Sequence, residues 1–507
     1  MQDRKEVTRR KAIGGMLKGG LGLAGLSTGL AGCVGSNRTG GATAPGLLVV
    51  AVDGLRADHL GIYGYDRETS PNLDSLSTDG VVFGQAFSSS PRLLPAHVSL
   101  LTGCQPWVAR RYLPTERDVS FERRWRLPVK VPHFAVDLLS KGWATAAFVD
   151  HSEVAPIYGF RTGFQLFVDS ADELTTGLSG LDRRIQQWVR GVDQDRPFFA
   201  YVQLHDLERS WADPDPEWER YFPARAELSE VPPNGMTDSV LFSVPYSRRR
   251  GSAVTLGAYE AAYDGHIRRL DKQLNSLFEG LRAIGRYEDT TIVVVGSHGL
   301  QFGEAGLYLS AGRYSVADLH VPLIIRPRRG ALDESRRGIR LDGVTSSTDL
   351  VPTLLGLEGL AIPAGTHGVS HARSIRDAVA GWSRELAFSS CGIQEGCALF
   401  GSRYVLEYLL ADGVSNPQLR RSWFGEDVGS YSSPRARFYD RSINPHPALS
   451  DAPRADAMET FERYRIAAAE WISTMEEMRR ALHGNSAFGE SVDGETLARL
   501  RAEGYLP

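Results

Sequence analysis

The stretch LLVVAVD, residues 47–53, decides the fold class of this chain. It is a short continuous apolar run that ends in a carboxylate, which predicts a strand buried on both faces of a parallel sheet. The same pattern returns in TIVVVGSH (291–298), and two further apolar runs are ATAAFVD (144–150) and FFAYVQL (198–204). Helical stretches at 131–142 and 265–285 lie between such runs. This alternation predicts an α/β sandwich with a mostly parallel central sheet.

Polar side chains follow two of the predicted strands. Asp53 comes directly after the first strand, and His298 closes the segment after the 291–296 run. In open α/β sheets the functional site lies outside the carboxyl ends of the strands. We therefore expect Asp53 and His298 to reach one rim of the sheet.

The character of the chain changes near residue 386. Short strand-like runs and turns replace the longer units, which predicts a smaller antiparallel subdomain over 386–507 after an α/β domain over 46–385. A helix near 455–483 carries a one-sided apolar stripe that should pack on the core, with Met458, Phe461, Ala468, Trp471, Met475, Met478 and Leu482. Residues 209–255 are polar and contain several prolines, so they are interpreted as a long surface excursion.

The composition excludes one class of partner. The chain has 507 residues, with 57 Lys and Arg against 61 Asp and Glu, which gives a net charge of -4. Nucleic-acid binding needs clustered positive charge, so no nucleic-acid partner is expected.

The first 45 residues differ from the rest. Arg9 and Arg10 precede a Gly-rich, weakly apolar segment that ends in LAGC at Cys33. This order resembles a twin-arginine export signal over 1–32 followed by a bacterial lipobox, which implies a lipid on Cys33 and a place in the bacterial cell envelope. The alternative is a basic tail with a chance cysteine. Residues 33–45 are small and polar and would form a flexible tether.

Two cysteines are close together in SSCGIQEGCALF. In an exported protein, Cys391 and Cys397 can close a disulfide across this Gly-containing loop. Zinc binding is the weaker alternative, because no second pair of Cys or His lies nearby.

Several segments follow one another in a fixed order along the chain; they include VVAVDGLRADHLGIYGYDRETSPNLDSLSTDGVVFGQAF, LLPAHVSLLTG, YDGHIRRLDKQLNSL, HGLQFGEAG, HVPLIIRP and SSTDLVPTLLGL. In this order they resemble the sulfatase family of the alkaline phosphatase superfamily. The resemblance covers about 46–450 and implies a three-layer, alkaline-phosphatase-like sandwich. It also implies a divalent cation at the strand ends, and a nucleophile just before a helix whose dipole favours negative charge.

The nucleophile position is occupied by an apolar residue. The family frame aligns through Pro95, His97 and SLLTG, and this register places Leu93 where the nucleophile belongs. Leucine has no nucleophilic atom. One of Ser88 to Ser90 is the conceivable substitute, but using it would move the attacking atom away from the helix start.

The metal and anion positions are also altered. Asp53 and His298 match metal ligands and are interpreted as a vestigial site, whereas Gly54 and Ser297 stand where carboxylates are expected. A serine hydroxyl is a weak ligand for a hard dication.

In YVQLHDLERSW, Gln203 and Glu208 replace two histidines of the family pattern. His97 and Arg313 remain as candidate anion-binding residues.

These replacements favour a sulfatase-like pseudoenzyme with no cofactor. It would bind a sulfated or phosphorylated glycan or lipid, or a protein partner, and reach the membrane through its anchor. Loss of several groups that act as a unit should remove the chemistry. The alternative is an active hydrolase using Ca, Mg or Mn, rebuilt from Asp53, His59, His97, His298, Glu304 and a nearby serine. A serine hydroxyl within about 4 Å of the Asp53 and His298 side chains would favour this alternative.

Overall fold

The computed structural model describes most of the chain from residue 43 onward. The described residues are 43–109, 111–112, 125–128, 130–169, 177–208, 256–304, 308–377, 384–390, 396–409, 435–442 and 455–483. The predicted signal at 1–32, Cys33, most of the tether, the excursion at 209–255 and Cys391 lie outside these ranges. Among the described helices, none is both long and apolar enough to cross a membrane.

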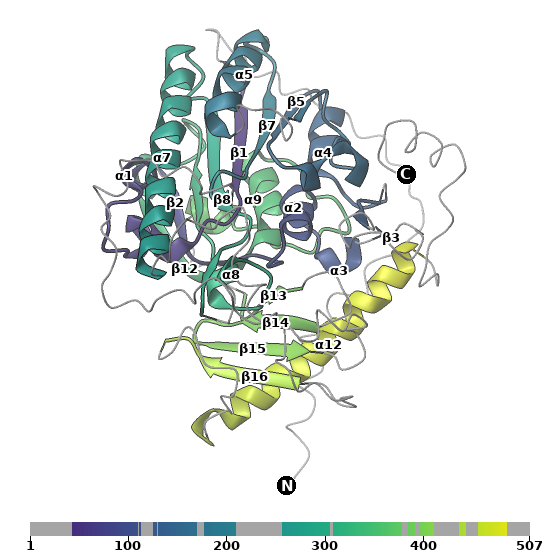
Figure 1. Cartoon of the computed structure of the whole chain (residues 1–507). Coiled ribbons are helices and arrows are strands. Elements are labelled where there is room, and N and C mark those ends of the chain that lie inside the picture. The colour runs from purple at the N-terminus through teal and green to yellow at the C-terminus, as the bar shows by residue number, and fades with distance from the viewer. Residues whose placement is uncertain are drawn as a thin grey trace, which may run out of the picture. The chain divides into compact units, whose positions relative to one another are not determined.

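An eight-stranded sheet forms the centre of the α/β body (Figure 1). Its strands, in spatial order, are β12 (Ile339–Ser346), β2 (Val81–Phe87), β11 (Leu323–Arg326), β8 (Thr290–Gly296), β1 (Gly46–Val52), β7 (Phe198–Leu204), β5 (Ala144–Val149) and β6 (Leu166–Asp169). Only the two pairings of β11 are antiparallel in this sheet. The four predicted strands are β1, β8, β5 and β7, and all their residues are buried, as a two-sided parallel sheet requires.

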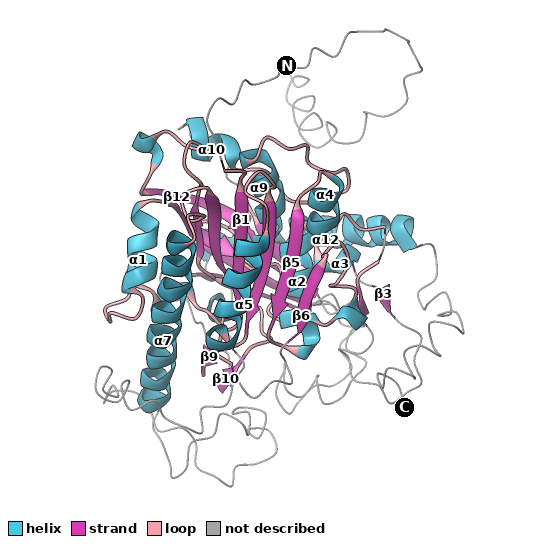
Figure 2. Cartoon of the chain, turned by 90° about the horizontal axis from the view of Figure 1, so that it is seen from above, coloured by secondary structure: helices cyan, strands magenta, loops and turns pink. Residues whose placement is uncertain are grey.

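Helices cover both faces of this sheet, which confirms the three-layer prediction (Figure 2). One apolar cluster joins the sheet to α1 (Pro71–Thr78), α5 (Leu178–Gly191) and α7 (Leu256–Ala283). The other joins it to α2 (Leu93–Thr102), α4 (Phe134–Ser140), α9 (Leu350–Leu357) and α10 (Ala372–Asp377). In α5 the buried residues Leu178, Leu181, Ile185 and Val189 recur every three or four positions, which is why this segment is a helix with one face on the sheet.

A four-stranded antiparallel sheet follows the α/β body, as predicted. It consists of β13 (Ala387–Ser389), β14 (Gly396–Phe400), β15 (Tyr404–Leu409) and β16 (Arg435–Asp440). One of its faces packs on Phe87 of β2 through Phe400, whose ring centroid is 4.6 Å away. The other face packs on the helix α12 (Met458–His483).

The predicted apolar stripe of α12 is correct in the middle and wrong at two positions. Ala468 and Met475 are buried, but Met458 and Met478 are 44% and 38% exposed. The buried face follows the helical period of 3.6 and continues to Arg479, which is buried instead of Met478. Trp471 is only partly buried, and a step of seven residues along the helix moves Met478 about 20° further away from the buried face, which explains its exposure.

The described chain also contains shorter elements. Besides several 3-10 helices, they include the helices α3 (Pro106–Ala109) and α8 (Val316–Leu319) and the strand pairs β3 (Arg111–Tyr112) with β4 (Trp125–Arg126) and β9 (Gln301–Phe302) with β10 (Tyr308–Ser310). Trp107 of α3 meets Trp471 of α12 edge to face, with ring centroids 5.9 Å apart.

Candidate active site

Three neighbouring strands end at the same level of the sheet. Val52 of β1 is in register with Leu204 of β7 and with Gly296 of β8. The next residues along the chain are Asp53, His205 and Ser297. Parallel register therefore places three polar side chains at one rim, as expected for Asp53.

Asp53 accepts four hydrogen bonds from side chains. His97 Nε2 and Ser297 Oγ donate to its Oδ1 at 2.8 and 2.5 Å. Gln203 Nε2 and His205 Nδ1 donate to its Oδ2 at 2.5 and 3.2 Å. Asp53 is fully buried. We call Asp53, His97, Gln203, His205, Glu208, Ser297 and His298 the Asp53 cluster.

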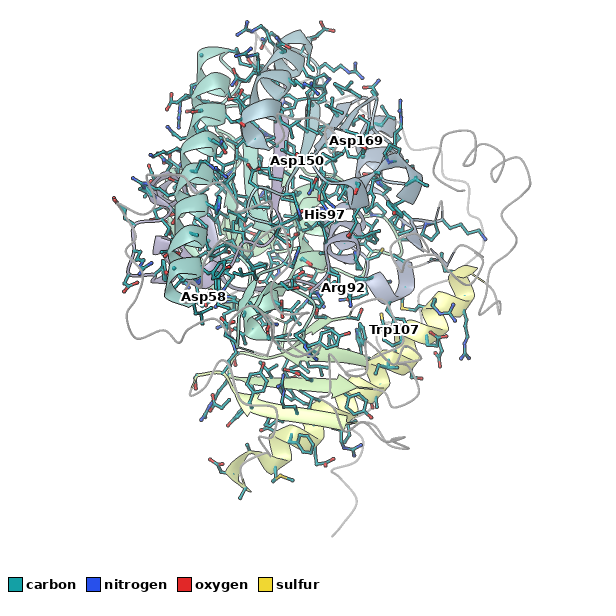
Figure 3. All side chains as sticks on the ribbon, viewed as in Figure 1. Asp58, Arg92, His97, Trp107, Asp150 and Asp169 are labelled. Carbon is teal, nitrogen blue, oxygen red and sulfur yellow. The ribbon has the colours of Figure 1, made fainter. Side chains whose placement is uncertain are left out.

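Two of the groups that donate to Asp53 are oriented by a second hydrogen bond on their other side. The backbone N–H of Asp150, which follows β5, donates to Gln203 Oε1 at 2.7 Å, so the amide must turn its NH₂ group toward Asp53. The hydroxyl of Tyr201 is hydrogen-bonded to His97 Nδ1 at 2.6 Å. Figure 3 shows His97 inside the α/β body, with Arg92 on the side of the C-terminal sheet. Both ring nitrogens of His97 are used, which leaves neither free for the anion predicted there.

Both ring nitrogens of His298 lie close to a polar side chain. Its Nδ1 lies 2.9 Å from Ser297 Oγ, and its Nε2 lies 2.7 Å from Glu208 Oε1. Burial lowers the pKa of His298, but the Glu208 carboxylate together with the charges of Asp53 and Asp318 outweighs burial and raises the pKa above its ordinary value. Gly54 makes room for this pair: its φ is +70°, and a Cβ there would lie 2.8 Å from Glu208 Cγ.

The electrostatics keep Asp53 ionised. Burial raises the pKa of Asp53, but the charge interaction with His97 and the hydrogen bonds from His205 and His97 outweigh burial. The pKa of Asp53 therefore lies well below its usual range. Burial and the Asp53 charge together raise the pKa of Tyr201 well above its usual range, so its hydroxyl keeps its proton.

This arrangement does not fit a divalent cation. Asp53 is surrounded by N–H and O–H donors, whereas a dication needs lone pairs turned toward it. Among the described residues, no group of three or more His, Cys, Asp or Glu side chains is placed to hold a metal ion. Asp53 and His298 do come together, but through hydrogen bonds that each of them makes with the Ser297 hydroxyl.

The predicted nucleophile position lies at the first residue of α2. Leu93 is only 7% exposed and belongs to the apolar cluster on that face of the sheet. The nearby serines hold the preceding loop: Ser88 Oγ donates to the Ser297 carbonyl at 2.5 Å, and the backbone N–H of Arg92 donates to Ser90 Oγ at 3.2 Å. Ser297 Oγ lies within the 4 Å limit of both Asp53 and His298.

Two residues of the alternative rebuilt site are bound to other partners. His59 Nδ1 pairs with Asp264 Oδ1 at 2.9 Å, and Glu304 Oε1 pairs with Arg56 at 2.5 Å. The structure therefore does not assemble the predicted set of Asp53, His59, His97, His298 and Glu304.

Arg313 lies beside negative charges. Burial lowers its pKa to about 10, and the charges of Glu407 on β15 and Asp318 act in the opposite direction. Its proposed role in anion binding stays a prediction.

Cys397 is a buried residue of β14. Its predicted partner, Cys391, lies outside the described residues, so the disulfide also stays a prediction.

Three residues that were not predicted from the sequence complete the site. His205 follows β7 as Asp53 follows β1, and that position was the signal that could have found it. Its ring stacks on His151, with centroids 4.1 Å apart. The Tyr201 hydroxyl and the Asp150 backbone N–H act through hydrogen bonds to His97 and Gln203, which no sequence motif predicts.

The fold of this chain is shared with known structures. A phosphonate monoester hydrolase of Agrobacterium radiobacter superposes with a TM-score of 0.63 at 17% identity, covering 86% of this chain and 96% of that chain. A 2-O GAG sulfatase gives 0.62 at 17% identity, covering 86% and 94%. These likenesses define an α/β protein with the fold of these two hydrolases.

Sequence comparisons define the family more narrowly. The family model described as Sulfatase matches residues 45–360, and the chain belongs to the sulfatase family. Human N-sulphoglucosamine sulphohydrolase is 25% identical over 345 residues, which cover 65% of this chain and 63% of that protein. An arylsulfatase of Clostridium perfringens is 23% identical over 385 residues, which cover 64% and 77%. The match to the human protein thus spans less than two thirds of its length.

Proposed function

We propose that this chain is a sulfatase-family protein that does not hydrolyse sulfate or phosphate esters by the family's mechanism. The observation that carries the proposal is Leu93, an apolar buried side chain at the first residue of α2, where the family frame places the nucleophile. No step of covalent catalysis can start from a hydrocarbon side chain.

The Asp53 cluster supports the same proposal. The two residues that match metal ligands, Asp53 and His298, have their polar atoms occupied by protein partners. Without a cation, the site lacks the Lewis acid that would polarise an ester.

We also propose a cellular location and a class of ligand for this protein. The protein would be anchored in the bacterial cell envelope by a lipid on Cys33 after removal of residues 1–32. It would bind a sulfated or phosphorylated glycan or lipid, or an envelope protein. The export-signal pattern at residues 1–33 supports the location in the cell envelope, and the names of the sulfatase relatives support the glycan class. Titration with a sulfated glycan and its desulfated counterpart tests the ligand class, because only the sulfated form should bind.

Turnover measurements test the central proposal. The chain from Cys33 onward, expressed without lipid, should show no turnover of aryl sulfates, phosphodiesters or phosphonate monoesters above buffer. Robust turnover that disappears in folded Asp53→Ala and His298→Ala variants would overturn it, and circular dichroism would verify that these variants are folded.

A second candidate function rests on Ser297. Its hydroxyl lies 2.5 Å from Asp53 Oδ1 and 2.9 Å from His298 Nδ1, which is the geometry of a serine beside a base. This candidate is a hydrolase with Ser297 as nucleophile and His298 or Asp53 as base.

The chemistry of the cluster is unfavourable for Ser297. The raised pKa of His298 favours its protonated form, and the lowered pKa of Asp53 makes that carboxylate a weak base. Ser297 is also fully buried. A Ser297→Ala variant decides: if wild type turns over an ester and the folded variant does not, Ser297 is the nucleophile.

A further inference from the structure

We propose that the Asp53 cluster replaces a metal ion. In this view, hydrogen bonds from Ser297, Gln203, His97 and His205 carry the stabilising role that a divalent cation would have at these strand ends, and the protein folds and remains stable without one. The inference is independent of catalysis: a metal-free hydrolase would overturn the proposed function and leave this inference intact.

The first step is the hydrogen-bonding capacity of Asp53. An ionised carboxylate offers about four lone-pair positions. Oδ1 accepts from His97 and Ser297, and Oδ2 accepts from Gln203 and His205. All four positions are therefore filled by donors from the same chain, at distances of 2.5 to 3.2 Å.

The second step concerns His298. A metal-bound imidazole presents a ring nitrogen lone pair to the cation. Here Nδ1 faces the Ser297 hydroxyl and Nε2 faces the Glu208 carboxylate. A carboxylate attracts an N–H and would repel a lone pair, so the Glu208 side of the ring carries a proton. Neither nitrogen is available to a cation unless one of these contacts breaks.

The third step concerns Gln203. Its oxygen is the amide atom that could face a cation, but it accepts from the backbone N–H of Asp150. Turning the amide over would place the NH₂ group against that N–H and leave a buried donor unpaired. The backbone after β5 thus fixes Gln203 as a donor to Asp53.

The fourth step is the connectivity of the cluster. Asp53 follows β1, Gln203 lies in β7, Ser297 follows β8, and His97 lies in α2. The contact from Asp150 adds β5. A cation at strand ends would join elements in the same way, and here hydrogen bonds to one buried carboxylate join them.

Ser297 is the residue whose replacement tests the inference most directly. A carboxylate at position 297 would face Asp53 at the place where the hydroxyl now donates at 2.5 Å. Two buried like charges at that range repel, and a dication between them would remove the repulsion. Ser297→Asp should therefore create a cation requirement that wild type lacks. Ser297→Asn is the matched control, because it has the size of Asp without the charge.

The experiment measures thermal unfolding of the chain from Cys33 onward in EDTA and in 1 mM Ca²⁺, Mg²⁺ or Mn²⁺. Wild type and Ser297→Asn should keep the same Tm within about 1 °C in all conditions. Ser297→Asp should melt lower in EDTA and recover by about 3 °C or more with at least one cation.

Two results would overturn the inference. One is a wild-type Tm that EDTA lowers and a cation restores, or a stoichiometric metal in the purified wild-type protein by elemental analysis. The other is a folded Ser297→Asp variant that responds to cations no more than Ser297→Asn. If Ser297→Asp does not fold in any condition, the wild-type measurements alone decide. Turnover assays play no part in this test, so its failure is distinguishable from failure of the proposed function.

Discussion

Replacing Gln203 by methionine tests how much the Asp53 cluster contributes to stability. Methionine has nearly the length and volume of glutamine, so the change removes hydrogen bonds without opening a large cavity. Gln203 is fully buried, donates to Asp53 Oδ2 at 2.5 Å and accepts from the Asp150 backbone N–H at 2.7 Å. Methionine can make neither contact.

The expected loss follows from these two contacts. A hydrogen bond to a charged group contributes about 1.5–3 kcal/mol, and an orphaned buried N–H costs about 1–3 kcal/mol. His205 still donates to Asp53 Oδ2, so the carboxylate keeps part of its stabilisation. The two effects together should lower the free energy of unfolding by about 3–5 kcal/mol.

Urea unfolding followed by circular dichroism measures this loss through the transition midpoint at constant slope. Gln187→Met is the control, because Gln187 is an exposed residue of α5, and its effect should stay within about 0.5 kcal/mol. A loss below about 1 kcal/mol for Gln203→Met, which is no more than one ordinary hydrogen bond, would refute the reasoning that the Asp53 cluster is a main stabilising feature.

Three other predictions follow from individual contacts. Gly54→Ala forces an Ala into φ +70° against Glu208 Cγ, so it should cost about 1–3 kcal/mol in urea unfolding, whereas Gly191→Ala, where a Cβ meets nothing within 4 Å, should not destabilise. The Arg384 and His371 partners of Asp349 outweigh burial and lower the pKa of that carboxyl from 3.8 to about 2, so its contribution to stability is present above pH 4 and lost as the pH falls toward 2. Asp349→Asn should remove about 2 kcal/mol of this acid sensitivity, measured as the difference in unfolding free energy between pH 5 and pH 2. If Cys391 and Cys397 form the predicted disulfide in exported protein, non-reducing peptide mass spectrometry will detect the linked pair; if not, burial raises the pKa of Cys397 and its thiol should resist alkylation until the protein unfolds.

The fold was largely predictable because a strand buried on both faces consists of consecutive apolar residues, which a sequence shows directly. Runs such as 47–52 and 291–296 have no polar face, and only a sheet covered on both sides accommodates them. The order of the strands was not predictable in the same way. β11 enters antiparallel between β8 and β2, and nothing local in its four residues distinguishes that direction.

The site was predictable in its position and less so in its contacts. Asp53 and His298 meet at one rim because strand ends align, which is a property of the backbone. Gln203, Ser297 and Glu208 were interpreted as losses because the family pattern has other residue types there. Their actual roles depend on side-chain direction, such as the Gln203 amide fixed by the Asp150 N–H, and a sequence pattern does not contain that information.

The replaced residues also form one consistent set. A buried carboxylate that has lost its partner costs several kcal/mol, so Asp53 could not remain ionised at this place with neither a cation nor donors around it. Ser297 and Gln203 each donate to Asp53, and Glu208 pairs with the ring of His298. The three positions that look like separate losses therefore compensate one another. Leu93 differs from them, because its side chain is apolar and belongs to the apolar cluster at the start of α2. The site thus combines a polar part, which we propose stabilises the strand ends, with an apolar part at the position that the family frame gives to the nucleophile, and the two parts can be tested separately.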